Sequence, residues 1–291
     1  MRSCVCHAYA KVNLSLAIVG QRPDGYHLLD MTMQSLSLFD VLRFTTVSNG
    51  IRIHCNWSLP LREKNIAYRA AQKMMEAAGV KHGVAIELEK HIPTQAGLGG
   101  GSADAAAVLL GLNALWELGF SQEELSEMGL ALGADVPFCL QGGTARAQGV
   151  GEVLVPAHVP KPMWFLLTQP QEGLSTARMF AAYHDCQKGP VPDTEAVLAA
   201  LAAGDLGGVA AASQNVFEPA ARGLCPALDT HFELLASTHP VFVRMTGSGS
   251  VVYGVYEEQS QALAAKEMLQ DKVFWVEVAA SAPHGVEMHL D

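Results

Sequence analysis

The feature that most constrains this chain is a glycine-rich segment, Gly-Leu-Gly-Gly-Gly-Ser over residues 97–102, which runs directly into an alanine-rich stretch over residues 103–115. We expect the alanine-rich stretch to form a helix. Glycine has no Cβ, so its backbone can take positive φ and approach a ligand closely. The first turn of a helix leaves backbone N–H groups unpaired and carries partial positive charge. The segment therefore predicts an anion site, most simply for the phosphates of a nucleotide.

Two common nucleotide-binding patterns do not fit this segment. The P-loop pattern needs a lysine before its final serine or threonine, and no lysine precedes Ser102. The dinucleotide fingerprint needs a third glycine where Ser102 stands, and a strand leading into a βαβ unit. A flexible loop or a packing turn remains the plain structural alternative. The residues expected to contact phosphate are Gly97, Leu98, Gly99, Gly100, Gly101, Ser102 and Ala103.

Charge and composition argue against several classes of protein. A net charge of −10 argues against nucleic acid or an anionic membrane as a bulk partner. No apolar run is long enough to span a membrane, and the N-terminus lacks the hydrophobic region of a signal peptide. Cys4-x-Cys6-His7 could suggest a metal site, but a partner cluster is missing and the six cysteines show no C-x-x-C spacing. We therefore expect a soluble cytoplasmic protein with reduced thiols.

Local patterns predict both strands and helices. Residues 8–19 alternate between apolar and polar side chains, which predicts a strand with one buried face. Lys11, Asn13 and Ser15 fall on its polar face, where an ordinary lysine points to solvent. Further strands are expected over 32–39, 40–46, 51–56, 84–89, 164–168, 241–245, 251–257 and 274–278. Helices are expected over 65–78, 103–115, from Ser121 onward, and over 194–203, 206–216 and 259–269.

The mixture of strands and helices in both halves predicts an α+β protein without a long parallel series of strands. The 291 residues, 49% of them hydrophobic, can bury enough core for two domains. Pro156, Pro160 and Pro162 are typical of a crossing between domains. We expect one domain over residues 1–157 and a second over residues 158–291.

Asp135 stands in an otherwise apolar run over residues 130–138. A carboxylate in such a run costs free energy unless it is paired or hydrogen-bonded. One interpretation is a turn or cap aspartate that ends a helix before Pro137. The other is a functional carboxylate held beside a cation.

The glycine segment resembles the phosphate loop of the GHMP kinases, a superfamily of small-molecule kinases. The motif Asp-Gly-Tyr-His narrows the resemblance to the branch that phosphorylates 4-diphosphocytidyl-2-C-methyl-D-erythritol, in the methylerythritol phosphate route to isoprenoid precursors. The matching blocks occur in the order and at the spacing of that branch. They are Ala-Lys-Val-Asn-Leu at 10–14, Gly-Gln-Arg-Pro-Asp-Gly-Tyr-His at 20–27, the loop at 92–107, Gly-Ala-Asp-Val-Pro at 133–137, and Met-Thr-Gly-Ser-Gly-Ser at 245–250.

The resemblance implies an N-terminal nucleotide-binding domain, a C-terminal ferredoxin-like domain, and an active site between them. It implies ATP and Mg²⁺ as cofactors, with transfer of a phosphoryl group to the 2-hydroxyl of the substrate. Lys11 and Asp135 would be the catalytic residues: Asp135 takes the proton of the attacking hydroxyl, and Lys11 holds it ionised. The resemblance places Asn65 and Lys90 near adenine, and it implies that Ser102 binds a phosphate oxygen or Mg²⁺.

The same resemblance implies a substrate site that recognises a cytidine diphosphate. Its expected residues are Asn13, Tyr26, His27, Phe180, Thr246, Gly247 and Ser248. A tyrosine packed on the sheet beside a surface histidine, and a simple hairpin at 247–249, are the structural alternatives. The partner is expected to be a small molecule, with no nucleic acid and no membrane, and the protein a monomer or a homodimer. Two other functions stay open: a homoserine or mevalonate type of GHMP kinase, and a non-catalytic ligand-binding member of the fold.

Overall fold

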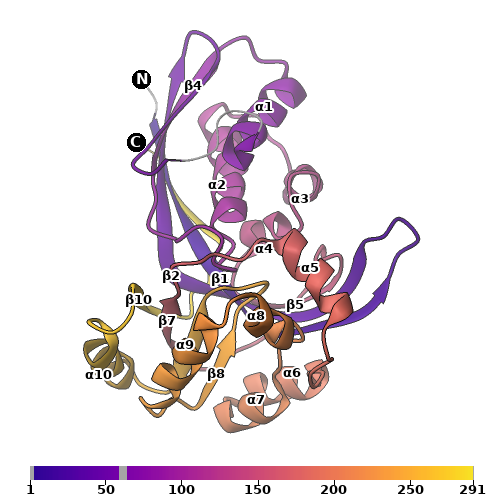
Figure 1. Ribbon diagram of the computed structural model, residues 1–291. Coiled ribbons are helices and arrows are strands. Elements are labelled where there is room, and N and C mark those ends of the chain that lie inside the picture. Colours follow the sequence, from indigo (N-terminus) through magenta and orange to yellow (C-terminus); the bar gives the residue numbers. More distant parts are fainter. Residues whose placement is uncertain (1–2, 59–63, 291) are drawn as a thin grey trace.

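The computed structural model describes residues 3–58 and 64–290, and over these residues the first layer is a seven-stranded sheet (Figure 1). Its main path runs β11-β1-β2-β4-β3, and β5 pairs with both β2 and β6. The strands are β1 (Ser3–Gln21), β2 (His27–Val47), β3 (Ile51–Cys55), β4 (Gly83–Glu89), β5 (Thr144–Gly149), β6 (Val153–Pro156) and β11 (Val286–Leu290).

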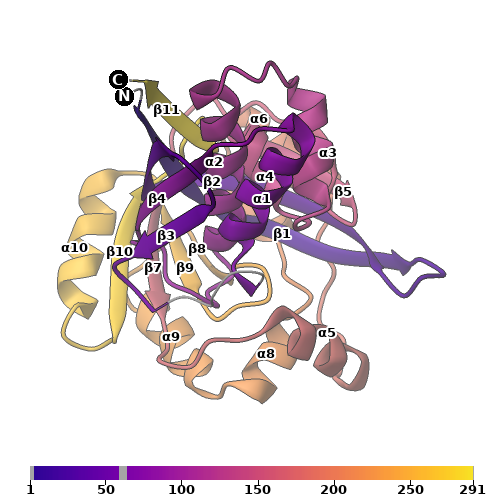
Figure 2. The same ribbon diagram turned by 90° about the horizontal axis from the view of Figure 1, so that it is seen from above.

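The sheet is organised by one long hairpin, β1 and β2, whose indigo end projects from the body in both views (Figures 1 and 2). The strands expected over 32–39 and 40–46 are a single strand. Its N-terminal half pairs with β5, and its C-terminal half pairs with β4. Because different strands continue the ladder at its two ends, β2 stays extended throughout its length.

The expectation that one face of the first strand meets solvent is wrong. Residues 11–17 are all buried, and Lys11 is only 4% exposed. The second half of the chain covers this face, since Asn13 N–H donates to the Thr246 hydroxyl at 3.0 Å and Tyr253 O–H donates to the Asn13 carbonyl at 2.9 Å. Alternation of residue types cannot reveal such cover, because it comes from a distant segment.

Helices pack on the other face of this sheet: α1 (Ile66–Ala78), α2 (Gly100–Leu115), α3 (Gln122–Leu130) and α4 (Val136–Gln141). The central helix α2 is apolar and buried almost all round, as its alanine-rich sequence predicts. Gly111 lets it approach the sheet closely, because a Cβ there would lie 2.7 Å from the Phe44 ring. Ser121 caps α3 with a capping box to Glu124, which confirms the predicted helix start.

The second layer is a four-stranded antiparallel sheet of β7 (Trp164–Gln169), β8 (Phe242–Met245), β9 (Val252–Tyr256) and β10 (Trp275–Ala280). The strand order β10-β7-β9-β8 is that of the expected ferredoxin-like layer. The helices of this half are α5 (Thr176–Asp185), α6 (Thr194–Ala203), α7 (Leu206–Ala212), α8 (Glu218–Leu224), α9 (Ala227–Ala236) and α10 (Gln259–Leu269). Within the described part of the chain, none is long and apolar enough to cross a membrane.

The helix expected over 206–216 ends earlier than predicted. It stops at Ala212 because the next residues pair with β1 instead. Leu16 N–H donates to the Gln214 carbonyl at 2.8 Å, and Val216 N–H donates to the Leu16 carbonyl at 3.1 Å. A backbone that hydrogen-bonds a neighbouring strand cannot also continue a helical ladder.

The chain returns to its first layer at its end. β11 pairs antiparallel with β1, so that Cys4 lies opposite Leu290 and the two termini lie side by side (Figure 2). A single cut between residues 157 and 158 therefore separates the two sheets except for β11. The predictions from sequence do not include the elements α4, β5, β6, α5, α8, α9 and β11.

Candidate active site

The glycine segment forms both the loop and the first turn of α2, which begins at Gly100 and not at residue 103. Gly97 and Gly99 take φ of 76° and 71°, where side chains are rarely tolerated. A Cβ on Gly97 would overlap the carbonyl oxygen of Thr246, and one on Gly99 would lie 2.9 Å from Cγ of Lys11. These glycines are therefore needed for the backbone conformation and for the close approach of the second layer and of β1.

Lys11 and Asp135 meet beside this loop. The Lys11 ammonium lies 3.2 Å from Oδ2 of Asp135 and donates to Oδ1 of Asn13 at 2.8 Å. Backbone contact fixes the lysine too, because its N–H donates to the Leu98 carbonyl at 2.9 Å. The lysine is almost fully buried, whereas the Asp135 side chain is 32% exposed. A buried cation thus faces a carboxylate that a ligand can still reach.

Asp135 stands at the N-cap position of α4 but does not serve as a side-chain cap. Its φ and ψ are helical, and its carboxylate makes no capping hydrogen bond to the helix. Pro137 within the first turn has no N–H to satisfy. The carboxylate is therefore directed to Lys11, and the interpretation as a cap aspartate is wrong.

The second glycine turn, over residues 246–249, packs against the phosphate loop. The Thr246 hydroxyl accepts from Asn13 N–H and donates to the Gly97 carbonyl at 3.2 Å. Asn215 holds the turn from the other side, donating to the carbonyls of Met245 and Gly247 at 2.8 Å each. The loop, the strand and the turn are thus tied together by hydrogen bonds, so the turn is more than a simple hairpin.

These segments line one cleft of about 640 Å³. The predicted site residues on its wall are Lys11, Asn13, Asn65, Lys90, Gly97, Leu98, Gly99, Gly100, Gly101, Ser102, Asp135, Phe180, Gly247 and Ser248. Ala103, Tyr26, His27 and Thr246 are not part of that wall. Ala103 is fully buried and its N–H donates to the Gly99 carbonyl at 2.9 Å, so its amide is already in the helical ladder.

Lys90 lies at the cleft but its ammonium is held by two buried carboxylates. It donates to Asp104 at 2.8 Å and also to Asp40. Burial lowers the pKa of Lys90, but the two carboxylates outweigh that effect and raise its net pKa. The other oxygen of Asp40 accepts from the backbone N–H groups of His91 and Ile92, so this cluster anchors the strand that enters the loop. Asn65 likewise has a local task, because it caps α1 by accepting from Ala67 N–H at 2.9 Å.

An aromatic group lies where the β1–β2 hairpin meets α5. His27 stacks on Phe180 with ring centroids 4.6 Å apart, and its Nε2 lies 3.0 Å from Nε2 of His184. Phe180 also meets Phe217 edge-on at 4.9 Å. Burial lowers the pKa of His27, and the charges of His184 and Lys188 lower it further, which favours a neutral imidazole. Tyr26, by contrast, is 65% exposed.

Several residues of the cleft were missed by sequence reasoning. Thr176 shares a hydrogen bond of 3.1 Å with Ser248, and Phe217 lines the wall beside Phe180. Neither stands in a recognisable motif, and their segments meet only in the fold. The sequence did contain a signal for Asp40 and Asp104. Each is an acidic residue among apolar ones, which indicates a buried carboxylate that needs a partner, although it does not identify that partner.

Family models match both halves of the chain. The model described as GHMP kinases N terminal domain matches residues 65–143, and the one described as GHMP kinases C terminal matches residues 197–274. The first match includes the glycine loop and Asp135. The second includes the glycine turn that packs against that loop.

Curated relatives are similar over nearly their full length. The 4-diphosphocytidyl-2-C-methyl-D-erythritol kinase of Syntrophomonas wolfei is 40% identical over 274 residues, covering 93% of this chain and 95% of the relative. The protein of that name from Desulfitobacterium hafniense is 42% identical over 275 residues, covering 92% and 93%.

Solved structures share the fold. A crystal structure of 4-(cytidine 5'-diphospho)-2C-methyl-D-erythritol kinase superposes with a TM-score of 0.81 at 38% identity, over 96% of this chain and 99% of that one. Homoserine kinase from Cytophaga hutchinsonii superposes with a TM-score of 0.77 over 99% and 97% of the chains, but at 20% identity it shows the common fold alone.

Proposed function

This chain belongs to the GHMP kinase family, and within it to the 4-diphosphocytidyl-2-C-methyl-D-erythritol kinases, and we propose that it transfers the γ-phosphoryl group of ATP to the 2-hydroxyl of 4-diphosphocytidyl-2-C-methyl-D-erythritol. The products are ADP and the 2-phosphate. The reaction belongs to the methylerythritol phosphate route to isoprenoid precursors. Family membership implies the use of ATP, and the name shared by the relatives supports the choice of alcohol.

The observation that carries this proposal is the Lys11–Asp135 pair, 3.2 Å apart beside the glycine loop. Asp135 takes the proton of the 2-hydroxyl. The oxygen of that hydroxyl forms the new bond to the γ-phosphorus, and the bond between this phosphorus and the bridging oxygen of ADP breaks. A positioned base of this kind contributes roughly 10²–10⁴-fold. Lys11 stabilises the negative charge on the transferring group, and the bond from its ammonium to Asn13 holds it in position.

The glycine loop supplies the phosphate site in this proposal. The first turn of α2 lines the cleft at Gly100, Gly101 and Ser102, and the first backbone N–H groups of a helix have no partner within it, so they can bind phosphate. The Ser102 hydroxyl, a hard oxygen donor on the cleft wall, would hold a Mg²⁺ ion together with substrate phosphates and water. When bound, the ion would offset charge on the phosphates.

The aromatic group at the turn end of the β1–β2 hairpin supplies the substrate specificity. Phe180, on the cleft wall, offers a stacking surface for a flat base, and the neutral imidazole of His27 can exchange a hydrogen bond with it. The exposed ring of Tyr26 on the same hairpin is a second stacking surface. A cytidine diphosphate uses both surfaces, whereas homoserine and mevalonate have no ring to place there.

The proposal also covers where the enzyme acts and what it contacts. We place it in the cytoplasm as a monomer or homodimer that acts on a free small molecule. The buried thiols of Cys139 and Cys225 are free, which suits a reducing compartment.

A coupled assay of ADP release tests the function directly. The wild type is expected to release ADP with the diphosphocytidyl alcohol, and at most slowly with homoserine, mevalonate or galactose. Asp135→Asn should reduce kcat by roughly 10²–10⁴-fold with little change in KM, because the lost group acts in the chemical step. Lys11→Ala should behave similarly, and the double variant should lose less than the sum of the two, because the pair acts in one step.

Two outcomes would contradict the proposal in different ways. Near-normal turnover by Asp135→Asn would show that this carboxylate is not the general base. Equal turnover of the diphosphocytidyl alcohol and the same alcohol without cytidine would show that the aromatic group does not recognise a base. His27→Ala is the matched variant, since it should weaken the full substrate by about 1–3 kcal/mol and leave the truncated alcohol and ATP unaffected.

A further inference from the structure

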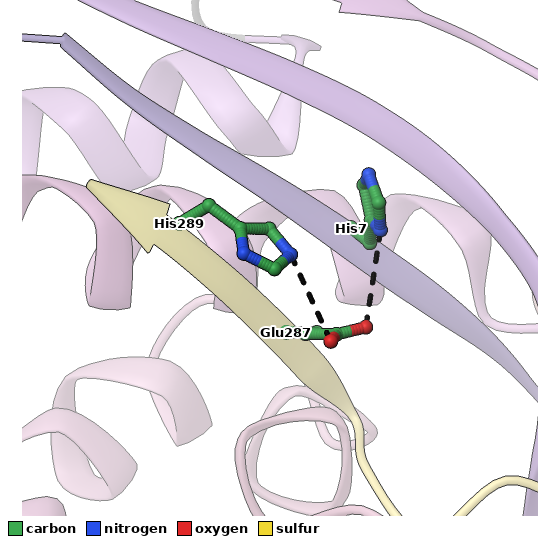
Figure 3. Close-up of side chains that lie close together, drawn as sticks. All are labelled: His7, Glu287 and His289. Atoms are coloured by element: carbon green, nitrogen blue, oxygen red, sulfur yellow. Dashed lines mark ion pairs between the residues drawn. The ribbon is translucent and has the colours of Figure 1, made fainter. Parts of the chain in front are cut away.

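Three side chains that the proposed reaction does not use converge on the outer face of the first sheet. His7, Glu287 and His289 each place one ligand atom within 4.8 Å of the others (Figure 3). Nδ1 of His7 lies 3.9 Å from one oxygen of Glu287, and Nε2 of His289 lies 3.7 Å from its other oxygen. Figure 3 shows the two imidazoles on either side of the carboxylate, each turning a nitrogen toward it.

Strand register brings these residues together. His7 on β1 is the direct antiparallel partner of Glu287 on β11, and His289 follows Glu287 by two residues on the same face. The neighbouring residues Cys6 and Ala8 point the opposite way, into the core under α2. The Cys-x-Cys-His motif is therefore split by the sheet, and His7 finds its partners on β11 instead of at the cysteines.

Neighbouring side chains hold two of these three in place. Tyr9 O–H donates to the Oε2 of Glu287 at 2.7 Å, and Phe39 stacks on the His7 ring at 4.3 Å. Hydrogen bonds and packing of this kind orient the ligands of established metal sites. All three residues stand on hydrogen-bonded strands, which position side chains more firmly than loops do.

We propose that His7, Glu287 and His289 bind a divalent transition-metal ion of the zinc class, which ties the last strand of the chain to the first. Two imidazoles and one carboxylate are a ligand set that Zn²⁺ takes in proteins, with the fourth position open to water. Bond lengths of about 2.0–2.1 Å place tetrahedral ligand atoms about 3.3 Å apart. One ligand atom from each residue already lies within 4.8 Å of the other two, and side-chain rotations would have to close the remaining gap.

The site is independent of the proposed kinase reaction. Its residues are on the outer face of the sheet and none of them lines the cleft. Mg²⁺ prefers an all-oxygen octahedral set and does not compete for imidazole nitrogens. Zn²⁺ bound here stabilises the folded chain, because the ligands meet only when β11 pairs with β1.

The test is a titration of the full chain, free of any affinity tag and stripped of metal, in buffer without nucleotide. Calorimetry with Zn²⁺ gives stoichiometry and affinity, and Co²⁺ gives a visible spectrum that reports tetrahedral coordination by nitrogen and oxygen. The variants are His289→Ala and His7→Ala. His91→Ala is the matched control, because His91, just after β4 of the same sheet, forms an exposed pair with Glu89 at 3.4 Å.

We expect wild type and His91→Ala to bind one Zn²⁺ per chain and to unfold at a higher temperature when it is present. His289→Ala and His7→Ala should bind at least about tenfold more weakly and lose the thermal shift. Equal binding by all four proteins, or an octahedral Co²⁺ spectrum in the wild type, would overturn the proposal. His289 is exposed near the end of the chain, so its variant keeps the test decisive even where His7→Ala folds poorly.

Discussion

Among the residues that the structure describes, two lysines are buried, and their partners decide what each can do. Lys90 meets two buried carboxylates, Asp40 and Asp104. Lys11 meets one carboxylate, Asp135, which remains open to the cleft, and an amide oxygen. A buried charge is costly unless partners compensate for it. Lys90 is therefore occupied as an anchor of the fold, while Lys11 keeps part of its charge available to a ligand.

We expect Lys90→Met to lower the free energy of unfolding by about 3–5 kcal/mol, because it leaves two buried carboxylates without their cation. The double variant Lys90→Met/Asp104→Asn should recover part of that loss, since one of the two carboxylates is then neutral. Urea unfolding followed by circular dichroism measures both. Lys64→Met is the control, because Lys64 is an exposed lysine at the same cleft and its loss should leave stability unchanged. If Lys90→Met weakened ATP binding without any loss of stability, the lysine would act as a nucleotide contact instead.

Motif spacing predicted the residues whose neighbours in sequence are also part of the site. Lys11, the glycine loop and Asp135 stand in recognisable blocks, and the fold does bring them together; their roles remain predictions. The partners of Lys90 could not be predicted, because Asp40 and Asp104 come from separate segments. Phe217 was hidden for the same reason, since one aromatic residue before a short helix has no local signature.

At the scale of elements, irregular pairing of β1 shapes the site. The register between β1 and β2 shifts between Tyr9 and Lys11, and again between Asn13 and Ser15. Such bulges bend a strand and re-aim its side chains, and they are common beside active sites. Lys11 and Asn13 lie between the two shifts. Strict alternation in the sequence predicts a regular strand, so neither the bulges nor the buried polar face could be inferred from it.

The first turn of α2 offers a sharp test of the phosphate loop. We expect Gly101→Ala to raise the Kd for ATP, because its new methyl group enters the space beside the phosphate site. The fold should tolerate it, since the nearest atom is a side-chain methyl of Ile66 at 3.3 Å and alanine favours a helix. Gly97 is unsuitable for this test, because a Cβ at that position would overlap the backbone carbonyl of Thr246.

Gly223→Ala in α8 is the matched control for this variant. It is also a helical glycine, and a Cβ there meets nothing within 4 Å. Both variants should keep or slightly raise the free energy of unfolding, by up to about 1 kcal/mol. Calorimetry with ATP and urea unfolding measure the two effects separately. An unchanged Kd for ATP in folded Gly101→Ala would exclude close approach of phosphate to this turn.

At the scale of the whole molecule, the sequence predicted local elements better than their assembly. Helical spacing and capping predicted α1, α3 and α10 closely, because those signals are local. The return of β11 to the first sheet could not be predicted, because its five residues are too few for a clear pattern and their partner strand lies at the other end of the chain. Helices α8 and α9 have prolines at their starts, which suggest loops: Pro219 stands in the first turn of α8, where proline is common, and Pro226 is the N-cap residue of α9.

The pH dependence of unfolding is set by titratable groups throughout the molecule. Two buried groups change the stability in opposite directions as the pH falls. Burial lowers the pKa of His231 from 6.5 and raises that of Glu218 from 4.5. Below pH 6.5 the unfolded chain therefore takes up the His231 proton before the folded chain does, so this residue reduces stability as the pH falls. Glu218 acts the other way, because its folded form binds a proton first and so gains stability as the pH approaches 4.5 from above.

We expect His231→Gln to flatten the fall in stability between pH 7 and pH 5.5, because glutamine cannot take up a proton in this window. Nδ1 of His231 has no hydrogen-bond partner among the described residues, so the neutral ring gives up little when it is replaced. Urea midpoints measured at half-unit pH steps give the slope for each protein. Glu218→Gln should instead steepen the fall, since it removes the opposing contribution. Parallel profiles for all three proteins would mean that neither buried group titrates differently in the folded and unfolded chain, which burial of both side chains argues against.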